Sequence, residues 1–407
     1  MAKTETTTYK LKDLLKIKNG KDHKALGNGS IPVYGSGGIM RYADSYLYDK
    51  ASILLPRKGS LDNIQYCDVP FWTVDTIYYT EVNESLCDAY YLYRYLKLLD
   101  LSQLDSGTGV PSMTFDSYYQ IEVKLPPLEA QKRIASMLKA LDSKIHINEQ
   151  INRNLEALAK QLYDYWFVQF DFPNEEGKPY KSSGGKMVWN EDLQINIPQN
   201  WDVCRLNEFI SKNNTGDWGA DEPSTNSIEV GCIRGADILK LNDLPKRHIK
   251  SSNTAKLLSN WDVVIEVSGG SPTQATGRSA YITPGVIKRN GGSITCSNFC
   301  HAFSFKDFKD SAYFYFVWRM FYDNNIMFNF EGKTSGIKNF MTEVFLANKW
   351  LKPTKSIVTK FFDAVKEIYA KIDSNIAENN NLIKQRDELL PLLMNGQISV
   401  NSDLSHD

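Results

Sequence analysis

A heptad pattern in the middle of the chain constrains its fold more than any other feature. Eight positions follow one another at alternating intervals of three and four, and no Pro or Gly occurs between residues 128 and 166. This spacing keeps one stripe of an α-helix against a partner helix. The positions are Leu138, Leu141, Ile145, Asn148, Asn152, Leu155, Ala159 and Leu162. A helix of about 30 residues spans roughly 45 Å at 1.5 Å per residue, which predicts a long spacer helix.

The same seam returns at an offset of 227 residues, with two Asn in the same two slots. The second seam consists of Val365, Ile368, Ile372, Asn375, Asn379, Leu382, Arg386 and Leu389. The match extends upstream, where Gly109, Val110, Met113 and Pro126 correspond to Gly336, Ile337, Phe340 and Pro353. A chance heptad is common, but polar exceptions repeated at one offset are not. The chain is therefore interpreted as two tandem units.

Each unit is predicted to be a globular α/β part followed by a long helix, which gives an α+β fold overall. Short apolar runs separated by Gly and Pro turns indicate strands in the globular parts, with one helix expected near residues 88–99 and its counterpart near 309–322. The expected boundaries are 1–127 for the first domain, 128–167 for the first helix, 168–200 for an extended linker, 201–353 for the second domain, 354–396 for the second helix and 397–407 for a disordered tail.

The two long helices are predicted to pack antiparallel, which relates the units by an approximate two-fold axis. That axis would place Asn148 beside Asn379 and Asn152 beside Asn375, so each buried amide would meet another amide. A parallel coil would instead pair Asn148 with Asn375, but the linker would then have to carry the second domain back to the same end. The antiparallel arrangement is preferred.

Composition sets broad limits. The 407 residues can form two or three domains, and the formal net charge of −1 provides no global basic field for nucleic acid. No apolar run approaches the roughly 20 residues that span a bilayer, and residues 1–10 lack the apolar core of a signal peptide. The six Cys are scattered without zinc-ligand spacing. A cytosolic protein with free thiols, no metal site and no membrane contact is expected.

Two patterns imitate catalytic motifs without completing them, and a third motif is missing altogether. Gly332, Lys333 and Thr334 resemble the end of a phosphate-binding loop, but Met327 stands where that loop needs Gly. Asp116 with Glu122 and Lys124 imitates a metal-dependent nuclease, although E-x-K is frequent in amphipathic strands. The Asn-Pro-Pro-Phe/Tyr loop of adenine methyltransferases is absent. No catalytic residues are therefore predicted.

Several runs together resemble the specificity (S) subunit of type I restriction–modification systems over essentially the whole chain. LPPLEAQKRIASMLKALDSKI, NEQINRNLEALAKQLYDYWFVQFDFP and RDELLPLLMNGQI are similar to that family's central and C-terminal helical regions. PVYGSGG, RKGS and VSGGSPTQATGR are similar to glycine turns of its target-recognition domains. The helical runs are specific, whereas each glycine run is weak by itself.

The resemblance implies a non-catalytic subunit of a bacterial or archaeal cytoplasmic complex, associated with the nucleoid when bound. It implies that the chain binds a two-part sequence in double-stranded DNA and holds two methyltransferase subunits, with optional restriction/motor subunits. S-adenosylmethionine, ATP and Mg would be used by those partners, and no cofactor would bind this chain. The helices would set the spacing between half-sites about one DNA turn, roughly 34–36 Å, apart.

Base contacts are expected from loops in which Arg, Lys, Ser or Asn stands near Gly, because Gly admits the duplex and Arg can grip guanine bidentately. In the first unit the candidates are Tyr34, Ser36, Arg57, Lys58, Ser106 and Thr108. In the second they are Arg234, Ser268, Ser271, Gln274, Arg278, Thr334, Ser335 and Lys338. The alternative is that any one of them is a solvent-facing turn residue, although some members of the set should contact DNA.

The helix ends are candidate docking surfaces for the methyltransferases, namely residues 165–167 (YWF) and 392–394 (LLM). The alternative is that these side chains pack on their own recognition domains. Arg386 interrupts the second seam where the first has Ala159, and either a carboxylate of the chain or a partner could pair with it. Two other classes compete with the scaffold hypothesis: a single-chain DNA nuclease or methylase, and a coiled-coil protein that forms homo-oligomers.

Overall fold

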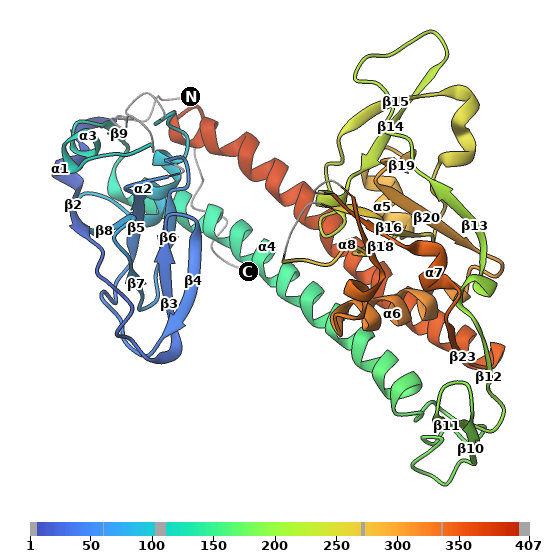
Figure 1. Cartoon of the computed structure of the whole chain (residues 1–407). Helices are drawn as coiled ribbons and strands as arrows, with labels where there is room; N and C mark the ends of the chain where they lie inside the picture. Colours follow the sequence, from blue (N-terminus) through green and yellow to red (C-terminus); the bar gives the residue numbers. More distant parts are fainter. Residues whose placement is uncertain (1–5, 60, 102–110, 270–272, 335–336, 399–407) are drawn as a thin grey trace. The chain divides into compact units, whose positions relative to one another are not determined.

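The computed structural model describes residues 6–59, 61–101, 111–269, 273–334 and 337–398. The chain folds into two compact units (Figure 1). One contains residues up to His146 together with those from Asn379 onward, and the other runs from Ile147 to Glu378. Each unit contains a mixed α/β domain and a stretch of both long helices, α4 (Leu128–Tyr163) and α8 (Lys355–Met394).

The first unit is built on a four-stranded sheet of order β2-β8-β5-β6. Every residue of β5 is buried, as suits an interior strand. A second sheet, β4-β3-β7, joins an antiparallel hairpin to a parallel third strand, and β1 pairs with β9. The strands are β1 (Thr7–Lys10), β2 (Leu15–Asn19), β3 (Asn28–Gly35), β4 (Gly38–Ala43), β5 (Ser52–Pro56), β6 (Gln65–Cys67), β7 (Trp72–Thr73), β8 (Ile77–Val82) and β9 (Glu122–Leu125).

Three short helices accompany these sheets: α1 (Leu11–Leu14), α2 (Ala89–Leu96) and α3 (Phe115–Tyr119). Helix α2 begins at an N-cap, because the Asp88 carboxylate accepts the backbone N–H of Tyr91 at 2.8 Å. The core of this unit draws on distant parts of the sequence. It includes Ile134, Ala135 and Leu138 of α4 and Leu390, Leu393 and Met394 of α8. The end of α8 therefore completes a core that the N-terminal domain begins.

The second unit repeats this plan with additions. Its sheets have the orders β13-β20-β16-β18, β15-β14-β19, β17-β22-β21, β12-β23 and β10-β11. The strands are β10 (Met187–Asn190), β11 (Ile195–Pro198), β12 (Asp202–Arg205), β13 (Ile210–Thr215), β14 (Ser227–Ile233), β15 (Lys246–Lys250), β16 (Val263–Glu266), β17 (Ser268–Gly269), β18 (Ser279–Tyr281), β19 (Ile294–Cys296), β20 (Cys300–Phe305), β21 (Glu331–Thr334), β22 (Ile337–Phe340) and β23 (Lys349–Lys352).

Helices in the second unit cover an aromatic core. They are α5 (Pro284–Arg289), α6 (Asp310–Asp323), α7 (Thr342–Leu346), a π-helical turn (Asp164–Val168) after α4, and 3-10 turns at Leu206–Phe209, Gly235–Asp237, Ser251–Lys256 and Ile326–Phe330. Phe167 lies 4.7 Å from Tyr313 of α6 and 4.9 Å from Phe361 of α8, between ring centroids. This cluster joins α4, α6 and α8 within the unit.

The two domains correspond strand by strand. In each, the first strand pairs antiparallel with the strand before the long helix, β1 with β9 and β12 with β23. The next turn is fastened by the same main-chain bond, from Leu11 N to Ile121 O (2.9 Å) and from Leu206 N to Asn348 O (3.1 Å). Ile121 and Asn348 stand at the 227-residue offset of the helical seam. The duplication therefore includes the globular domains.

Antiparallel packing of the long helices is visible inside each unit. In the second, Asn148 donates to Glu378 at 2.7 Å, and Asn375 donates to Asn152 at 2.8 Å, as the sequence predicted for that amide pair. In the first, Asn379 donates to the carbonyl of Ile145 at 3.3 Å. Asn148 and Asn379, the other expected pair, belong to different units. All sixteen seam positions of the two helices are buried or half-buried.

Arg386 pairs within its own chain. Its guanidinium lies 2.9 Å from Asp142 of α4 and 2.8 Å from the neighbouring Asp387. Asp142 also pairs with Arg94 and accepts a hydrogen bond from Tyr90, both on α2. One carboxylate therefore connects α2, α4 and α8 in the first unit.

The predicted extended linker is more structured than expected. Residues 187–198 contain the β10–β11 hairpin, and Phe170 and Phe172 are buried. Phe172 stacks on Trp201 with centroids 5.1 Å apart. The abundant Pro, Gly, Lys and Asn of this segment predicted an extended linker over the surface, but its aromatic side chains attach it to the second domain. The helices expected near 88–99 and 309–322 are present as α2 and α6.

Candidate nucleic-acid interface

Three segments that follow strands meet in the first unit around Thr76. The backbone N–H groups of Arg57 and Lys58, just after β5, donate to the Thr76 carbonyl at 3.0 and 3.3 Å. The N–H of Ser36, just after β3, donates to Thr76 Oγ1 at 3.3 Å. Lys58 also forms a β-bridge with Ser112. The structure thus brings together Ser36, Arg57 and Lys58, three of the predicted base-contacting residues.

The side chains in this cluster differ in their exposure to solvent and in their contacts. Lys58 is exposed, whereas Arg57 is half-buried, donates to the Asp75 carbonyl at 3.3 Å and lies over the Tyr78 ring at 5.9 Å. Tyr34 packs edge-on against Phe71 at 6.2 Å, and burial raises the pKa of its hydroxyl above the usual value. Tyr34 therefore forms part of the support beneath the loops. Ser106 and Thr108 lie outside the described residues.

Gly59 is required by the backbone at this turn. Its φ of +90° lies in the left-handed region that L side chains rarely adopt, and its N–H donates to the Pro111 carbonyl at 2.9 Å. The glycine in RKGS thus has a conformational cause, and it lets the chain turn back beside residues 111–113.

The corresponding segments of the second unit form the small sheet β17-β22-β21. Ser268 pairs with Asn339 in the strand register, and its hydroxyl donates to Asn339 Oδ1 at 2.6 Å. The N–H of Phe340 donates to the Val267 carbonyl at 2.8 Å, as that of Met113 does to Arg57 at 3.1 Å in the first unit. Residues 113 and 340 stand at the 227-residue offset, so both domains place the same two loops side by side.

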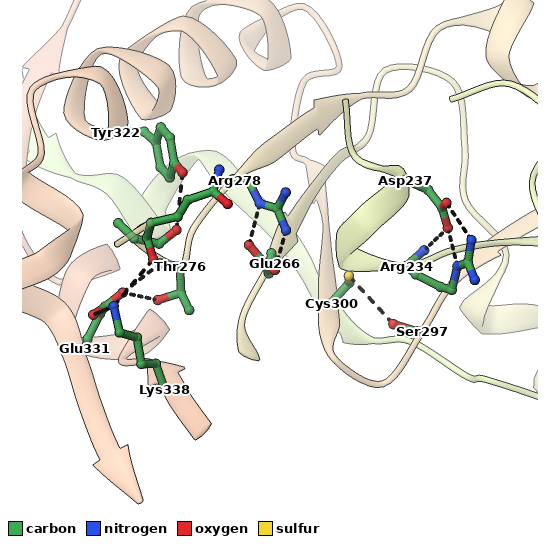
Figure 2. Close-up of polar contacts among 12 residues, drawn as sticks. Arg234, Asp237, Glu266, Thr276, Arg278, Ser297, Cys300, Tyr322, Glu331 and Lys338 are labelled. Carbon is green, nitrogen blue, oxygen red and sulfur yellow. Dashed lines mark hydrogen bonds and ion pairs between the residues drawn. The ribbon is translucent and has the colours of Figure 1, made fainter. Parts of the chain in front are cut away.

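The basic candidates of the second unit are engaged with carboxylates (Figure 2). Arg234 bends back onto Asp237 with an N–O distance of 2.7 Å. Arg278 holds Glu266 through two bonds of 2.8 and 2.7 Å. Lys338 lies 3.0 Å from Glu331. In the structure these three cations are paired with carboxylates of their own domain, and their contact with bases stays a prediction.

The remaining candidates of the second unit lie along the same loops. Gln274 is exposed, and its carbonyl accepts a hydrogen bond of 3.4 Å from Lys338. Thr334 ends β21. Ser271 and Ser335 are outside the described residues.

Two residues that sequence reasoning missed are Glu266 and Glu331. Glu266 ends the otherwise apolar run VVIE, where a buried charge demands a partner, and this was the available signal. A Cβ on Gly235 would approach Glu266 Oε1 to 2.7 Å, so the glycine of GCIRGADI leaves space for the carboxylate. Glu331 gave no comparable signal, because Thr276, which donates to its carboxylate, lies 55 positions away in the sequence.

The helix ends divide between core and surface. Trp166 and Phe167 belong to the core of the second unit, and Leu393 and Met394 to that of the first. Their neighbours Tyr165 and Leu392 are both 38% exposed and stand at the 227-residue offset. Four of the six proposed docking side chains thus pack on their own units, and two remain on the surface.

The described residues offer few groups that could support a metal-dependent or thiol-dependent reaction. Among them, no group of three or more His, Cys, Asp and Glu side chains is placed to hold a metal ion. The thiols are all buried, and burial raises the pKa of Cys87 and Cys300 to about 12, which disfavours the reactive thiolate. In the same part of the chain, the helices lack the long apolar stretch that crossing a membrane requires.

Comparisons with known proteins point in one direction. Residues 3–157 match the family described as type I restriction modification DNA specificity domain. The specificity subunit of the type I restriction enzyme MjaIX, from Methanocaldococcus jannaschii, is 23% identical over 369 residues, which cover 87% of this chain and 79% of that protein. The HindI specificity subunit of Haemophilus influenzae is 23% identical over 358 residues, covering 75% and 74%.

A solved structure shares the fold. The crystal structure of the type I restriction–modification S subunit from M. genitalium superposes with a TM-score of 0.58 at 15% identity and covers 96% of both chains. The family match lies in the first domain and the first long helix, and the relatives extend the similarity through the second copy of each. Residues 3–157 therefore match a DNA specificity domain, and over most of its length the chain is similar to specificity subunits of type I restriction–modification systems.

Proposed function

We propose that the chain recognises a bipartite DNA sequence, one half with each domain, and performs no catalytic step itself. The observation that carries this proposal is the duplicated loop pair. Residues 57–59 lie beside 111–113 in one domain, and 267–269 lie beside 338–340 in the other, in matching register. Two equivalent loop pairs on one chain fit a target with two short halves.

The helices support an inverted arrangement of the halves. Within each unit, residue numbers that rise along α4 meet numbers that fall along α8, from Asn148 with Glu378 to Asn152 with Asn375. Antiparallel pairing is what the two-fold relation expected from the sequence requires, and on that basis we propose that the domains read their halves from opposite strands. We propose that the length of the helices determines the unspecified spacer between the halves.

The same proposal includes the partners. Two methyltransferase subunits dock on the exposed sides of the helices, where Tyr165 and Leu392 stand at equivalent surface positions. Restriction/motor subunits join outside them in systems that cleave DNA. S-adenosylmethionine belongs to the methyltransferases, ATP and Mg belong to the restriction subunits, and the assembly works in the cytoplasm.

The test is co-purification with a candidate methyltransferase, followed by single-molecule sequencing of DNA exposed to the complex. Methylated adenines within one motif of two halves around a fixed spacer are expected. Modification at a single undivided site would refute the two-domain part of the proposal, and absence of any modification would refute the assignment to a methylating complex.

A second experiment tests the spacer. Inserting one heptad into α4 and one at the equivalent point of α8 lengthens both helices by about 10 Å at 1.5 Å per residue. The motif found by sequencing should then keep its two halves and acquire a longer spacer. An unchanged spacer would show that the helices do not measure the distance.

The competing hypotheses make different predictions for the isolated chain. A single-chain nuclease would cleave DNA when metal ions are added, whereas the specificity subunit would not. A coiled-coil homo-oligomer would give several chains per particle by light scattering, whereas helices that pair within one chain give a monomer.

A further inference from the structure

The two recognition domains use their basic side chains differently. In the second unit Arg278 and Lys338 each lie within 3.0 Å of a carboxylate, and only 17% and 15% of these side chains are exposed. In the first unit Lys58 is exposed, and the Arg57 guanidinium donates to a main-chain carbonyl, that of Asp75, at 3.3 Å. Equivalent loops therefore present different chemistry to a ligand.

We propose that Glu266 and Glu331 are positioning residues for residues 275–278, which form the C-terminal stem of the second recognition loop. In this proposal the two carboxylates fix the geometry of the stem. Arg278 and Lys338 influence DNA binding by pairing with these carboxylates and do not contact DNA themselves. The inference rests on the proposed function, because it concerns how one half of the DNA target is read.

Glu266 closes the base of the loop. Its N–H donates to the Arg278 carbonyl at 2.8 Å, and its own carbonyl accepts the N–H of Gly277 at 2.9 Å. The bidentate side-chain pair with Arg278 adds two charge-assisted bonds at the same place. Main-chain and side-chain hydrogen bonds thus both hold Glu266 against Arg278.

Glu331 attaches the stem to the neighbouring loop. Its carboxylate accepts the N–H and the hydroxyl of Thr276 at 2.7 and 3.1 Å, and it pairs with Lys338 at 3.0 Å (Figure 2). Burial raises the pKa of Glu331, but these hydrogen bonds outweigh it, so its pKa lies below the usual value. The charged form is therefore the one that the site holds.

Two side chains of α6 donate hydrogen bonds to further main-chain carbonyls of the stem. Trp318 Nε1 donates to the Gly277 carbonyl at 2.7 Å, and the Tyr322 hydroxyl donates to the Ala275 carbonyl at 3.2 Å. Four successive residues, 275–278, are thereby bonded to groups outside the loop or at its base. Such a stem presents the exposed Gln274 in one geometry.

Energetics favour the positioning role over direct contact. If Arg278 turned toward DNA, Glu266 would be left buried without its counter-charge, which is strongly unfavourable. Arg234 is different, because 48% of its side chain is exposed and a surface ion pair is weak. Arg234 can leave Asp237 for a phosphate at little cost, which makes it the matched control.

The experiment uses the full chain, co-purified with a methyltransferase if needed, and a random duplex library as the probe. Wild type should select a two-part sequence. Affinity is then measured for this duplex and for one with the second half scrambled, using Glu266→Gln, Arg278→Gln and the double variant. Each single change should weaken binding of the intact duplex roughly tenfold, and the double variant should be no worse than either alone.

Salt dependence separates the two roles. A side chain that contacts a phosphate contributes about one unit to the slope of log K against log salt, whereas a positioning residue contributes none. Arg278→Gln should leave the slope unchanged, and Arg234→Gln should reduce it. If Arg278→Gln reduces the slope while Glu266→Gln preserves or strengthens binding, Arg278 contacts DNA directly and the proposal is wrong.

A second pair guards against loss of folding. Glu331→Gln and Lys338→Gln alter the other anchor, and thermal melting identifies any variant that fails to fold. Both should weaken selection of the second half and preserve that of the first. Wild type selecting no sequence would refute the proposed function itself, whereas wild-type selection with indifferent variants at both anchors would refute only the positioning role.

Discussion

Asn375 of α8 donates a hydrogen bond of 2.8 Å to Asn152 of α4, amide to amide, within the seam between the two helices. Each side chain satisfies the other, so neither amide is left unpaired in the seam. Shifting the helices by one heptad would place both amides against apolar residues. The pair therefore favours the observed register over its neighbours.

Replacing one amide should destabilise the second unit, and replacing both should recover the loss. Asn375→Leu leaves Asn152 without this partner, which costs about 1–3 kcal/mol. The Asn152→Leu, Asn375→Leu double variant should be at least as stable as either single variant, because two leucines pack together. Urea denaturation of the three variants measures this coupling, and strictly additive losses would contradict it.

Removing the Asp142 carboxylate, which pairs with side chains of α2 and α8, should lower the free energy of unfolding more than removing an exposed charge does. Asp142→Ala leaves Arg94, which is buried, without a counter-charge and frees Arg386, at a cost of about 3 kcal/mol. Lys384→Ala serves as the control, because its pair with Glu388 is exposed and 3.9 Å long, and the change should stay within about 0.5 kcal/mol. Equal losses in the two denaturation curves would refute the role of Asp142.

Stability of the second unit should depend on Asp310. Burial and the neighbouring Asp307 raise the pKa of Asp310 from 3.8 to about 6. Between these values the folded chain holds a proton that the unfolded chain releases, so stability falls as pH rises from about 4 to 6 and stays lower above that.

Asp310→Asn removes this titration. At pH 7 the variant should be more stable than wild type by about 1 kcal/mol, after allowing for partial exposure, and the difference should narrow as pH falls toward 4. Thermal melting of both proteins across this range is the measurement. A difference that does not change with pH would show that Asp310 titrates normally.

The helix ends offer a paired test of docking. Tyr165→Ala and Leu392→Ala change exposed side chains, so each should alter stability little yet weaken capture of the methyltransferase. Phe167→Ala should cost about 3–5 kcal/mol in stability, because that ring lies in the aromatic core. Unchanged capture by both surface variants would move the docking surface elsewhere.

Sequence reasoning succeeded where a pattern repeats along the chain. The seam predicted both long helices, and the Asn positions predicted the contact between Asn152 and Asn375 because polar exceptions in a seam need each other. The linker was underestimated, because no local pattern reveals that Phe172 finds Trp201 across a turn-rich segment.

The candidate site was predictable at the level of loops and not at the level of side chains. Glycine turns marked residues 57–59 and 267–269 as parts of candidate loops, and the structure places them beside residues 111–113 and 338–340. Partner choice is a long-range property, however, and Glu331 reaches Thr276 from 55 positions away. Local sequence therefore cannot distinguish a basic residue held by a carboxylate, such as Arg278, from one exposed to solvent, such as Lys58.

The second unit is a continuous stretch, residues 147–378, whereas the first is interrupted by it. During synthesis the N-terminal domain emerges early, but its core lacks Leu390, Leu393 and Met394 until the whole second unit has been made. N-terminal domains usually fold first, but here the second unit can be complete before the core of the first unit is. A chain that stops after residue 378 would contain every residue of the second unit but would lack the part of α8 that completes the core of the first.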